Sequence, residues 1–178
     1  VRGLTADLAT LQRLGTTLRS ADWAVTATVE MDTWDRPQGP PRLVDILPGD
    51  LSGESWGLAV DIGTTTVSAY LVDLVSGQVV QQAAEYNGQI ARGEDIISRI
   101  IYASKGDGLA DLRDKVLETI NQLIDRVTRR QRIRPEHIYK ATVAGNTTMM
   151  HLFLGVPPEP IRLTPYIPTV NDWPTLRA

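Results

Sequence analysis

The sequence predicts an α/β protein with two parts: a small αββ domain, and a larger domain built as three strands, two helices, a strand and a helix. Three observations support this prediction. Leucines recur at spacings of three and four near the start, which is typical of an amphipathic helix. Apolar and polar residues then alternate in several short segments, which is typical of strands. A polar segment at residues 51–55 separates the two sets of elements.

The small domain is expected to cover residues 1–52. Its helix is predicted at Thr5–Leu18, and its strands at Trp23–Met31 and Leu43–Leu47, joined by a Pro- and Gly-rich loop at 35–41. The alternation in the first strand places its apolar residues on one face. The leucines of the helix are expected to form one buried stripe, and they are Leu4, Leu8, Leu11, Leu14 and Leu18.

The larger domain is expected at residues 56–178, and it begins with three strands. They are predicted at Gly57–Asp61, Thr66–Asp73 and Gln78–Tyr86. Because only short turns join these strands, consecutive strands must be antiparallel neighbours.

Helices follow the third strand. The segment RGEDIISRIIYA, residues 92–103, carries isoleucines on one face, and Asp95 is expected to pair with Arg99 one turn on. A longer helix is predicted at Leu109 to about Arg130, and a fourth strand at Ile138–Ala144. The stretch TTMMHLFLG then predicts a short helix that ends at its glycine.

Composition excludes several classes of function. Of the 178 residues 42% are hydrophobic, enough for a core, and the net charge of −3 gives no reason to expect nucleic acid or a membrane surface as a partner. The sequence has no cysteine, which excludes disulfides, thiolate catalysis and cysteine-bound metal within these residues. We expect a cytoplasmic protein, and the first residue, Val1, indicates a piece of a longer chain.

The stretch AVDIGTTTVSAYLVD places a carboxylate, a glycine and three threonines at the bend of the first hairpin. Gly63 would let a phosphate chain approach the backbone amides, and the hydroxyls of Thr64, Thr65 and Thr66 lie beside them. Asp61, at the end of a strand, is placed to hold Mg²⁺ through water. An alternative is ordinary hairpin chemistry, because Asp and Gly favour turns and Thr favours strands.

Three separated blocks resemble a known family. The sequence GLAVDIGTTTVSAYLVDLVSGQVV resembles the first phosphate-binding hairpin of the acetate kinase, sugar kinase, heat-shock chaperone and actin (ASKHA) superfamily. NGQIARGEDIISRI and VAGNTTMMHLFLGVPPEPI are similar to blocks of the ATP-dependent reductive activators of corrinoid proteins. The small αββ unit ending in ILPGD resembles the middle domain that precedes the actin-like part in that family.

The resemblance implies a fold and an activity. The larger domain would be the first half of a ribonuclease-H-like, actin-like ATPase domain, with three antiparallel strands, helices and a further strand. The full-length protein would use ATP and Mg²⁺ to reduce a Co(II) corrinoid to Co(I) on a corrinoid methyl-carrier protein. A 2Fe-2S cluster is expected only in a part of that protein outside these cysteine-free residues. The fragment alone is expected to be inactive.

The resemblance also assigns site residues. Asp61 is expected to be catalytic and to hold the metal, and the nucleotide-binding residues are Gly63, Thr64, Thr65, Thr66, Gly145, Asn146 and Thr147. The last three begin the final helix, where exposed N–H groups could face the phosphates, although a helix cap and hinge contact explains them equally well.

Residues between the third strand and the isoleucine-rich helix are further candidates. Gln89 is expected to orient an attacking water and is the second catalytic candidate. Asn87 could line the same cleft, or make a turn with Gly88. We expect Asp95 to cap its helix.

Other functions remain open at this point. The rival is a non-catalytic dimerisation or docking module, in which the phosphate turn is vestigial. A third hypothesis is another ASKHA-type kinase, or an activator of the 2-hydroxyacyl-CoA dehydratase type. The expected partners are a corrinoid protein, a nucleotide and a second copy bound through the small domain, but no nucleic acid and no membrane.

Overall fold

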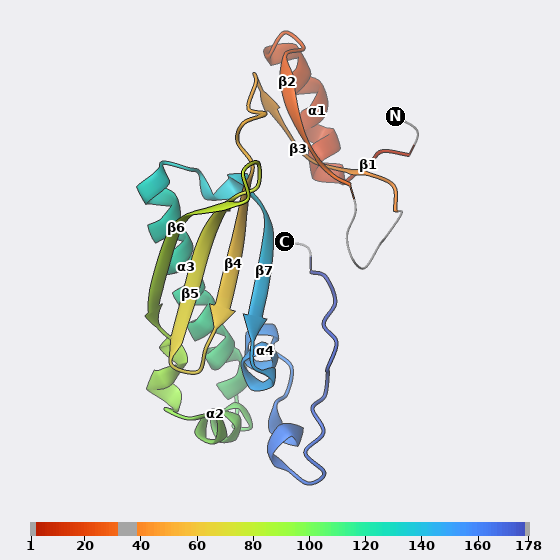
Figure 1. The fold of residues 1–178 in the computed structure, drawn as a ribbon. Coiled ribbons are helices and arrows are strands. Elements are labelled where there is room, and N and C mark those ends of the chain that lie inside the picture. The colour runs from red at the N-terminus through yellow and green to blue at the C-terminus, as the bar shows by residue number, and fades with distance from the viewer. Residues whose placement is uncertain (1–2, 32–38, 177–178) are drawn as a thin grey trace. The chain divides into compact units, whose positions relative to one another are not determined.

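The structure, a computed structural model, describes residues 3–31 and 39–176 and confirms the α/β fold class (Figure 1). Contacts divide the chain into two units. We call Val1–Glu54 with Pro174–Ala178 the small unit and Ser55–Trp173 the large unit. Part of the predicted Pro- and Gly-rich loop, at 35–38, lies outside the described residues.

The small unit has one helix on a three-stranded sheet with the order β1-β3-β2. The strands are β1 (Thr5–Ala6), β2 (Val25–Glu30) and β3 (Arg42–Pro48), and the helix is α1 (Leu8–Ser20). The short β1, which we did not predict, pairs parallel to β3, whereas β2 pairs antiparallel to it. The helix begins later than predicted because the side chain of Asp7 caps its first turn.

The predicted leucine stripe of α1 is wrong. Leu8 is 70% exposed and Leu11 is 52% exposed. The helix instead turns Thr10 toward the sheet, and its hydroxyl donates to the carbonyl of Val44 on β3 at 3.4 Å. Because a three-stranded sheet is narrow, it covers only part of a wide apolar face. Trp23, predicted to belong to β2, lies before it with a positive φ and is exposed.

The large unit is built on a four-stranded sheet with the order β6-β5-β4-β7. Its strands are β4 (Trp56–Ile62), β5 (Thr66–Asp73), β6 (Gln78–Tyr86) and β7 (Ile138–Gly145). The predicted antiparallel hairpins are confirmed, and β7 pairs parallel to β4. Among the described strands, β7 pairs with β4 alone, so it forms the border of the sheet.

Helices lie on one face and at one end of this sheet. The α-helices are α2 (Ile96–Ala103), α3 (Gly108–Gln131) and α4 (Thr147–Leu154). Short 3-10 turns, η1 (Gly88–Arg92), η2 (Pro135–His137) and η3 (Glu159–Arg162), connect the elements. Within the described ranges, no helix is both long and apolar enough to cross a membrane.

The core of the large unit lies between α3 and the sheet. Alternate residues of β4 and β5 face α3, including Val60, Ile62 and Val67, and they pack with Leu112 and Leu123 of that helix. Burying each such side chain contributes roughly 1.5–3 kcal/mol. In Figure 1 the opposite face of the sheet carries no helix of the described large unit. Residues that alternate with the core positions therefore reach an open face.

Candidate functional site

The candidate site is centred on the bend between β4 and β5, which we call the Gly63–Thr66 turn. The amide of Gly63 donates to the carbonyl of Thr66 at 3.0 Å and closes the turn. A Cβ atom at position 63 would lie 2.6 Å from that carbonyl oxygen, which is closer than real Cβ atoms approach. The turn therefore requires glycine for close backbone approach.

Three successive carbonyls of the turn are tied inward. The side-chain amide of Asn87 donates to the carbonyl of Gly63 at 2.9 Å, and Nη2 of Arg99 donates to that of Thr64 at 2.7 Å. The backbone amide of Asn87 donates to the carbonyl of Thr65 at 2.8 Å. In a trans peptide the next N–H points away from the carbonyl. The amides of Thr64 and Thr65 therefore point away from these inner donors.

These two amides are available to an anion. Within the described part of the chain, no group accepts a hydrogen bond from the amide of Thr64 or Thr65. The side chains of Thr65 and Thr66 are exposed beside them. Adjacent free amides with hydroxyls alongside form a small positive surface that suits a phosphate oxygen.

Asp61 lies on the open face of the sheet. Its neighbours Val60 and Ile62 are buried toward α3, whereas Asp61 is exposed. Across the sheet it stands in register with Ser68 on β5 and Ala144 on β7, which are small side chains. In the described residues, no side chain forms an ion pair or hydrogen bond with its carboxylate. The carboxylate is therefore free to hold a hydrated cation.

The start of α4 contacts the turn. The side-chain oxygen of Asn146 accepts from the amide of Met149 at 3.0 Å and caps the helix. Its side-chain nitrogen donates to the hydroxyl of Thr64 at 3.3 Å. Gly145 stands beside Ile62 in the sheet, where a Cβ would lie 3.1 Å from the carbonyl of Ile62. The cap and the contact with the turn are thus both present.

The first residue of α4, Thr147, is exposed. Its carbonyl contacts Nδ1 of the buried His151 at 2.7 Å, which helps to hold the first turn of α4. The structure thus brings the predicted binding residues of both segments to one end of the sheet, where the helix dipole of α4 is positive.

Gln89 is placed differently from the other candidates. It is fully buried, and its side-chain nitrogen donates to the carbonyl of Leu112 at 2.9 Å. Its side-chain oxygen accepts from Arg99 at 3.3 Å and from Asn87 at 3.4 Å. This geometry makes Gln89 part of the support under the turn. A role in orienting water stays a prediction.

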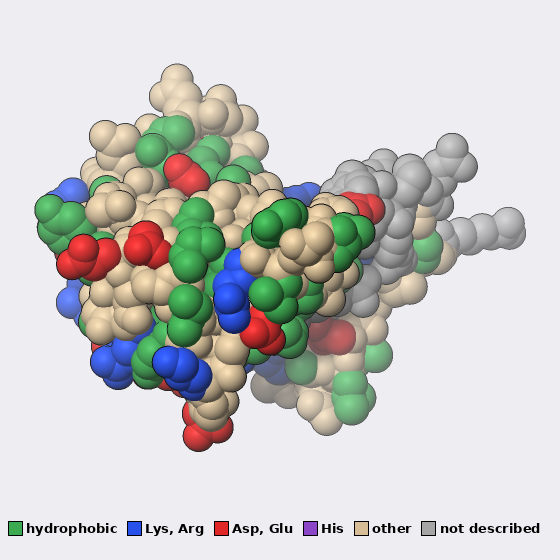
Figure 2. Space-filling model, turned by 90° about the horizontal axis from the view of Figure 1, so that it is seen from below, with side chains coloured by type: hydrophobic (Ala, Val, Ile, Leu, Met, Phe, Trp, Pro, Cys, Tyr) green, Lys and Arg blue, Asp and Glu red, His purple; other side chains and the backbone are tan. Residues whose placement is uncertain are grey.

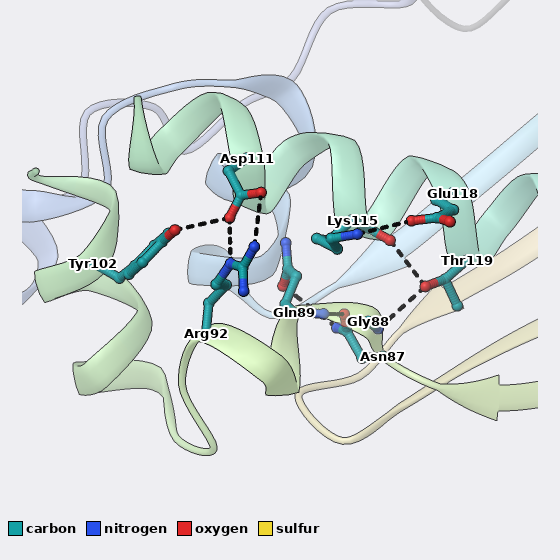
Figure 3. A network of polar contacts seen from close by, with 9 residues as sticks. All are labelled: Asn87, Gly88, Gln89, Arg92, Tyr102, Asp111, Lys115, Glu118 and Thr119. Carbon is teal, nitrogen blue, oxygen red and sulfur yellow. Dashed lines mark hydrogen bonds and ion pairs between the residues drawn. The ribbon is translucent and has the colours of Figure 1, made fainter. Parts of the chain in front are cut away.

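The segment that carries Asn87 and Gln89 is held against α3. In Figure 3 Arg92 and Tyr102 converge on Asp111, with contacts of 2.6 Å and 2.9 Å. The amide of Gly88 donates to the hydroxyl of Thr119 at 3.1 Å. The Arg92 guanidinium and the Tyr102 hydroxyl hold the pKa of Asp111 below its ordinary value. This network anchors η1 at both ends.

The position of Arg99 beneath the turn could not be predicted from the sequence. The predicted pair with Asp95 is wrong, because Asp95 instead caps α2 by accepting from the amide of Ser98 at 2.7 Å. The capping role expected for Asp95 is thereby confirmed. Arg99 turns into the interior, next to the buried Ile100. An arginine within an isoleucine-rich segment was the available signal.

The surrounding surface has a mixed character. Seen from the end where α2 and α4 lie, Figure 2 shows hydrophobic, basic and acidic side chains interspersed. No group of three or more His, Cys, Asp or Glu residues is gathered for a metal within the residues that the structure describes. An anion at this end would be attracted by oriented amides rather than by a broad positive field.

The fold and the turn define a half-domain of the kind expected for the reductive activators of corrinoid proteins. Comparison with known families agrees with this class. Residues 56–178 match the family described as the RACo middle region, and residues 1–53 match the RACo linker region. The chain therefore belongs to the RACo family. In this family the residues of the small unit correspond to the linker region, and those of the large unit to the middle region. The small αββ domain is therefore not the middle domain that the sequence resemblance suggested.

Two relatives support this assignment. The chain is 37% identical over 139 residues to the "Corrinoid activation enzyme RamQ" of Eubacterium limosum, covering 77% of this chain and 23% of the relative. It also matches a solved structure described as "Reductive activator for corrinoid,iron-sulfur protein", with 44% identity and a TM-score of 0.78. That match covers 93% of this chain and 26% of the other. The chain thus spans about a quarter of the length of these relatives.

Proposed function

We propose that this chain is part of an ATP-dependent activator that reduces a Co(II) corrinoid to Co(I) on a corrinoid methyl-carrier protein. The large unit contributes its first phosphate-binding loop, the Gly63–Thr66 turn. Two kinds of observation support the proposal. Both relatives are named for corrinoid activation. The turn directs two amides without described partners away from the carbonyls that its inner donors hold.

The residues present fit a nucleotide phosphate chain and Mg²⁺. The amides of Thr64 and Thr65 would hold phosphate oxygens, with the start of α4 beside them at Asn146. Asp61 would orient waters of the magnesium ion. Hydrolysis of bound ATP would supply the free energy for an uphill electron transfer. The contribution of this chain is to bind and orient the phosphates. The observation that carries this proposal is that Asn87 and Arg99 donate hydrogen bonds to the carbonyls of Gly63 and Thr64 from the inner side of the turn.

The residues present do not fit an iron–sulfur cluster, because the sequence contains no cysteine. We place the 2Fe-2S cluster of the proposed activator outside these residues. The protein would act in the cytoplasm. A homodimer through the small unit is supported by the exposed Leu8 and Leu11, which form apolar surface on α1.

Titration of the full-length protein with Mg·ATP tests the proposal. Asp61→Asn is expected to weaken Mg·ATP binding by about tenfold or more, because a charge-assisted contact with a metal-bound water is lost. ATP-stimulated formation of Co(I), followed by absorbance, should fall in parallel. Asp114→Asn is the matched control, since Asp114 is exposed on α3. Unchanged binding and hydrolysis in Asp61→Asn would contradict the proposal.

A further inference from the structure

Arg99 is a buried cation placed directly beneath the Gly63–Thr66 turn. It is 0% exposed and is the largest fully buried side chain among the described residues. Its Nε donates to the carbonyl of Gly93 at 2.7 Å, and its Nη2 donates to that of Thr64 at 2.7 Å. Its Nη1 lies 3.3 Å from the side-chain oxygen of Gln89. All three nitrogens of the guanidinium are therefore engaged by neutral groups.

The charge of Arg99 has no carboxylate counterpart within reach. In the described ranges, no Asp or Glu forms an ion pair with it. Burial lowers its pKa, and the more distant charge of Asp95 only partly opposes that effect. A guanidinium remains protonated in proteins. The fold therefore holds an uncompensated positive charge in its interior, which is costly unless an anion balances it.

The position of this charge indicates which anion would balance it. Arg99 contacts the carbonyl of Thr64, and the same peptide unit presents the amide of Thr65 on its other side. A hydrogen bond to the carbonyl from a cation polarises the peptide and strengthens its N–H as a donor. A phosphate oxygen bound at the amide of Thr65 would thus lie in line with the guanidinium. Asn87 orients the preceding peptide, between Gly63 and Thr64, in the same way, but its side chain is neutral.

We propose that Arg99 is a positioning residue for phosphate binding at the Gly63–Thr66 turn. It fixes the Thr64–Thr65 peptide with its N–H toward the ligand, and through that peptide it supplies the positive charge opposite a bound phosphate. The inference rests on the proposed function of the turn. It also links α2, which carries Arg99, to the occupancy of the turn.

The test compares two substitutions in the full-length protein, using calorimetry with pyrophosphate, Mg·ATP and adenosine. Arg99→Gln removes the charge, whereas Arg99→Lys retains it but loses the fork of donors. We expect Arg99→Gln to weaken pyrophosphate and Mg·ATP by about tenfold or more, and Arg99→Lys by about threefold or less. Adenosine, which lacks phosphate, should bind both variants like the wild type.

Arg129→Gln is the control for loss of charge, because Arg129 is an exposed residue of α3 whose ion-pair partner is Asp125. It should bind all three ligands like the wild type. Equal losses in Arg99→Gln and Arg99→Lys, or equal losses for adenosine and pyrophosphate, would indicate packing alone and overturn the inference. A wild-type protein that binds neither pyrophosphate nor Mg·ATP would overturn the proposed function as well.

A second measurement does not depend on the folding of a variant. In wild-type protein labelled with ¹⁵N at threonine, saturating pyrophosphate should shift the amide resonances of Thr64 and Thr65. The amide of Thr128, which lies near the C-terminal end of α3, should not shift. If the resonances of Thr64 and Thr65 stay in place while calorimetry shows binding, the phosphate lies elsewhere and Arg99 cannot position it.

Discussion

The side-chain nitrogen of Asn146 lies 3.3 Å from the hydroxyl oxygen of Thr64, although 82 positions separate the two residues in the chain. The same side chain caps α4 through its oxygen. One amide group therefore begins a helix and contacts the Gly63–Thr66 turn. The parallel pairing of β7 with β4 makes this possible, because the C-terminal ends of both strands lie at the same end of the sheet.

The two functions of Asn146 can be separated. Asn146→Asp retains an oxygen for the cap and should leave the free energy of unfolding close to that of wild type. It removes the donor to Thr64 and adds a negative charge, so it should weaken Mg·ATP binding. Asn146→Ala loses the cap as well and should cost about 1 kcal/mol in urea unfolding. Wild-type ATP affinity in Asn146→Asp would show that this end of α4 does not face the nucleotide.

Gly63→Ala should distort the turn. The added Cβ would lie 2.6 Å from the carbonyl oxygen of Thr66, which is part of the backbone and cannot move alone. We expect a loss of at least about 1 kcal/mol in unfolding free energy and weaker binding of Mg·ATP. Gly53→Ala is the control, because no atom lies within 4 Å of its Cβ position and the change should stay within about 0.5 kcal/mol. Equal stability of the two variants would refute the steric argument.

The strands of the large unit could be predicted closely from the sequence. β5 and β6 begin and end where the alternation predicts, at Thr66–Asp73 and Gln78–Tyr86. Their period of two is local information, because alternate side chains reach opposite faces. The wrong stripe on α1 has a different origin. Periodicity shows that Leu8 and Leu11 share a face, but it does not show how much of that face the sheet covers.

The candidate site was only partly readable. Glycine and threonine at a bend indicate a turn, and the family resemblance added the link to Asn146. The hydrogen bonds from Asn87 and Arg99 to the carbonyls of the turn could not be predicted from the sequence. They depend on side chains 24 and 35 positions away from the carbonyls that they contact. An arginine one turn after an aspartate favours a surface pair in an isolated helix. Tertiary packing overrides that preference here.

Core and surface leucines should differ sharply in their contribution to stability. Leu112→Ala removes a fully buried side chain between α3 and the sheet, and we expect a loss of about 2–5 kcal/mol in unfolding free energy. At concentrations at which the protein is monomeric, Leu11→Ala, at an exposed position of α1, should change that free energy by less than about 0.5 kcal/mol. Urea unfolding followed by circular dichroism measures both. A large loss in Leu11→Ala would mean that this leucine is covered in solution.

Acid should weaken the anchor of η1. The pKa of Asp111 is lowered from its ordinary 3.8, first by the hydrogen bond from Arg92 and then by that from Tyr102. A lowered pKa in the folded state means that the contribution of this group is complete above pH 3.8 and is lost as the pH falls through the folded value.

The unfolding free energy, measured from pH 7 down to pH 2, checks this prediction. Asp111→Asn should be less stable than wild type at neutral pH, and the difference should shrink below pH 3.8. In Asp111→Asn the unfolding free energy should depend less on pH in the acid range than in wild type. Some dependence should remain, because the pKa of Asp95 is also lowered. A difference that is constant over the whole range would exclude ionisation of Asp111 as its cause.

β7 forms a border of the sheet, and its outer peptide groups have no strand beside them in the described chain. Such a row of donors and acceptors is a template for any extended segment, and the exposed Lys140 is the kind of charge that discourages such pairing. Protein in which no further segment covers the outer edge of β7 should therefore self-associate as its concentration rises. Added salt screens the charge of Lys140, so it should increase the rate at which these β-sheet assemblies form.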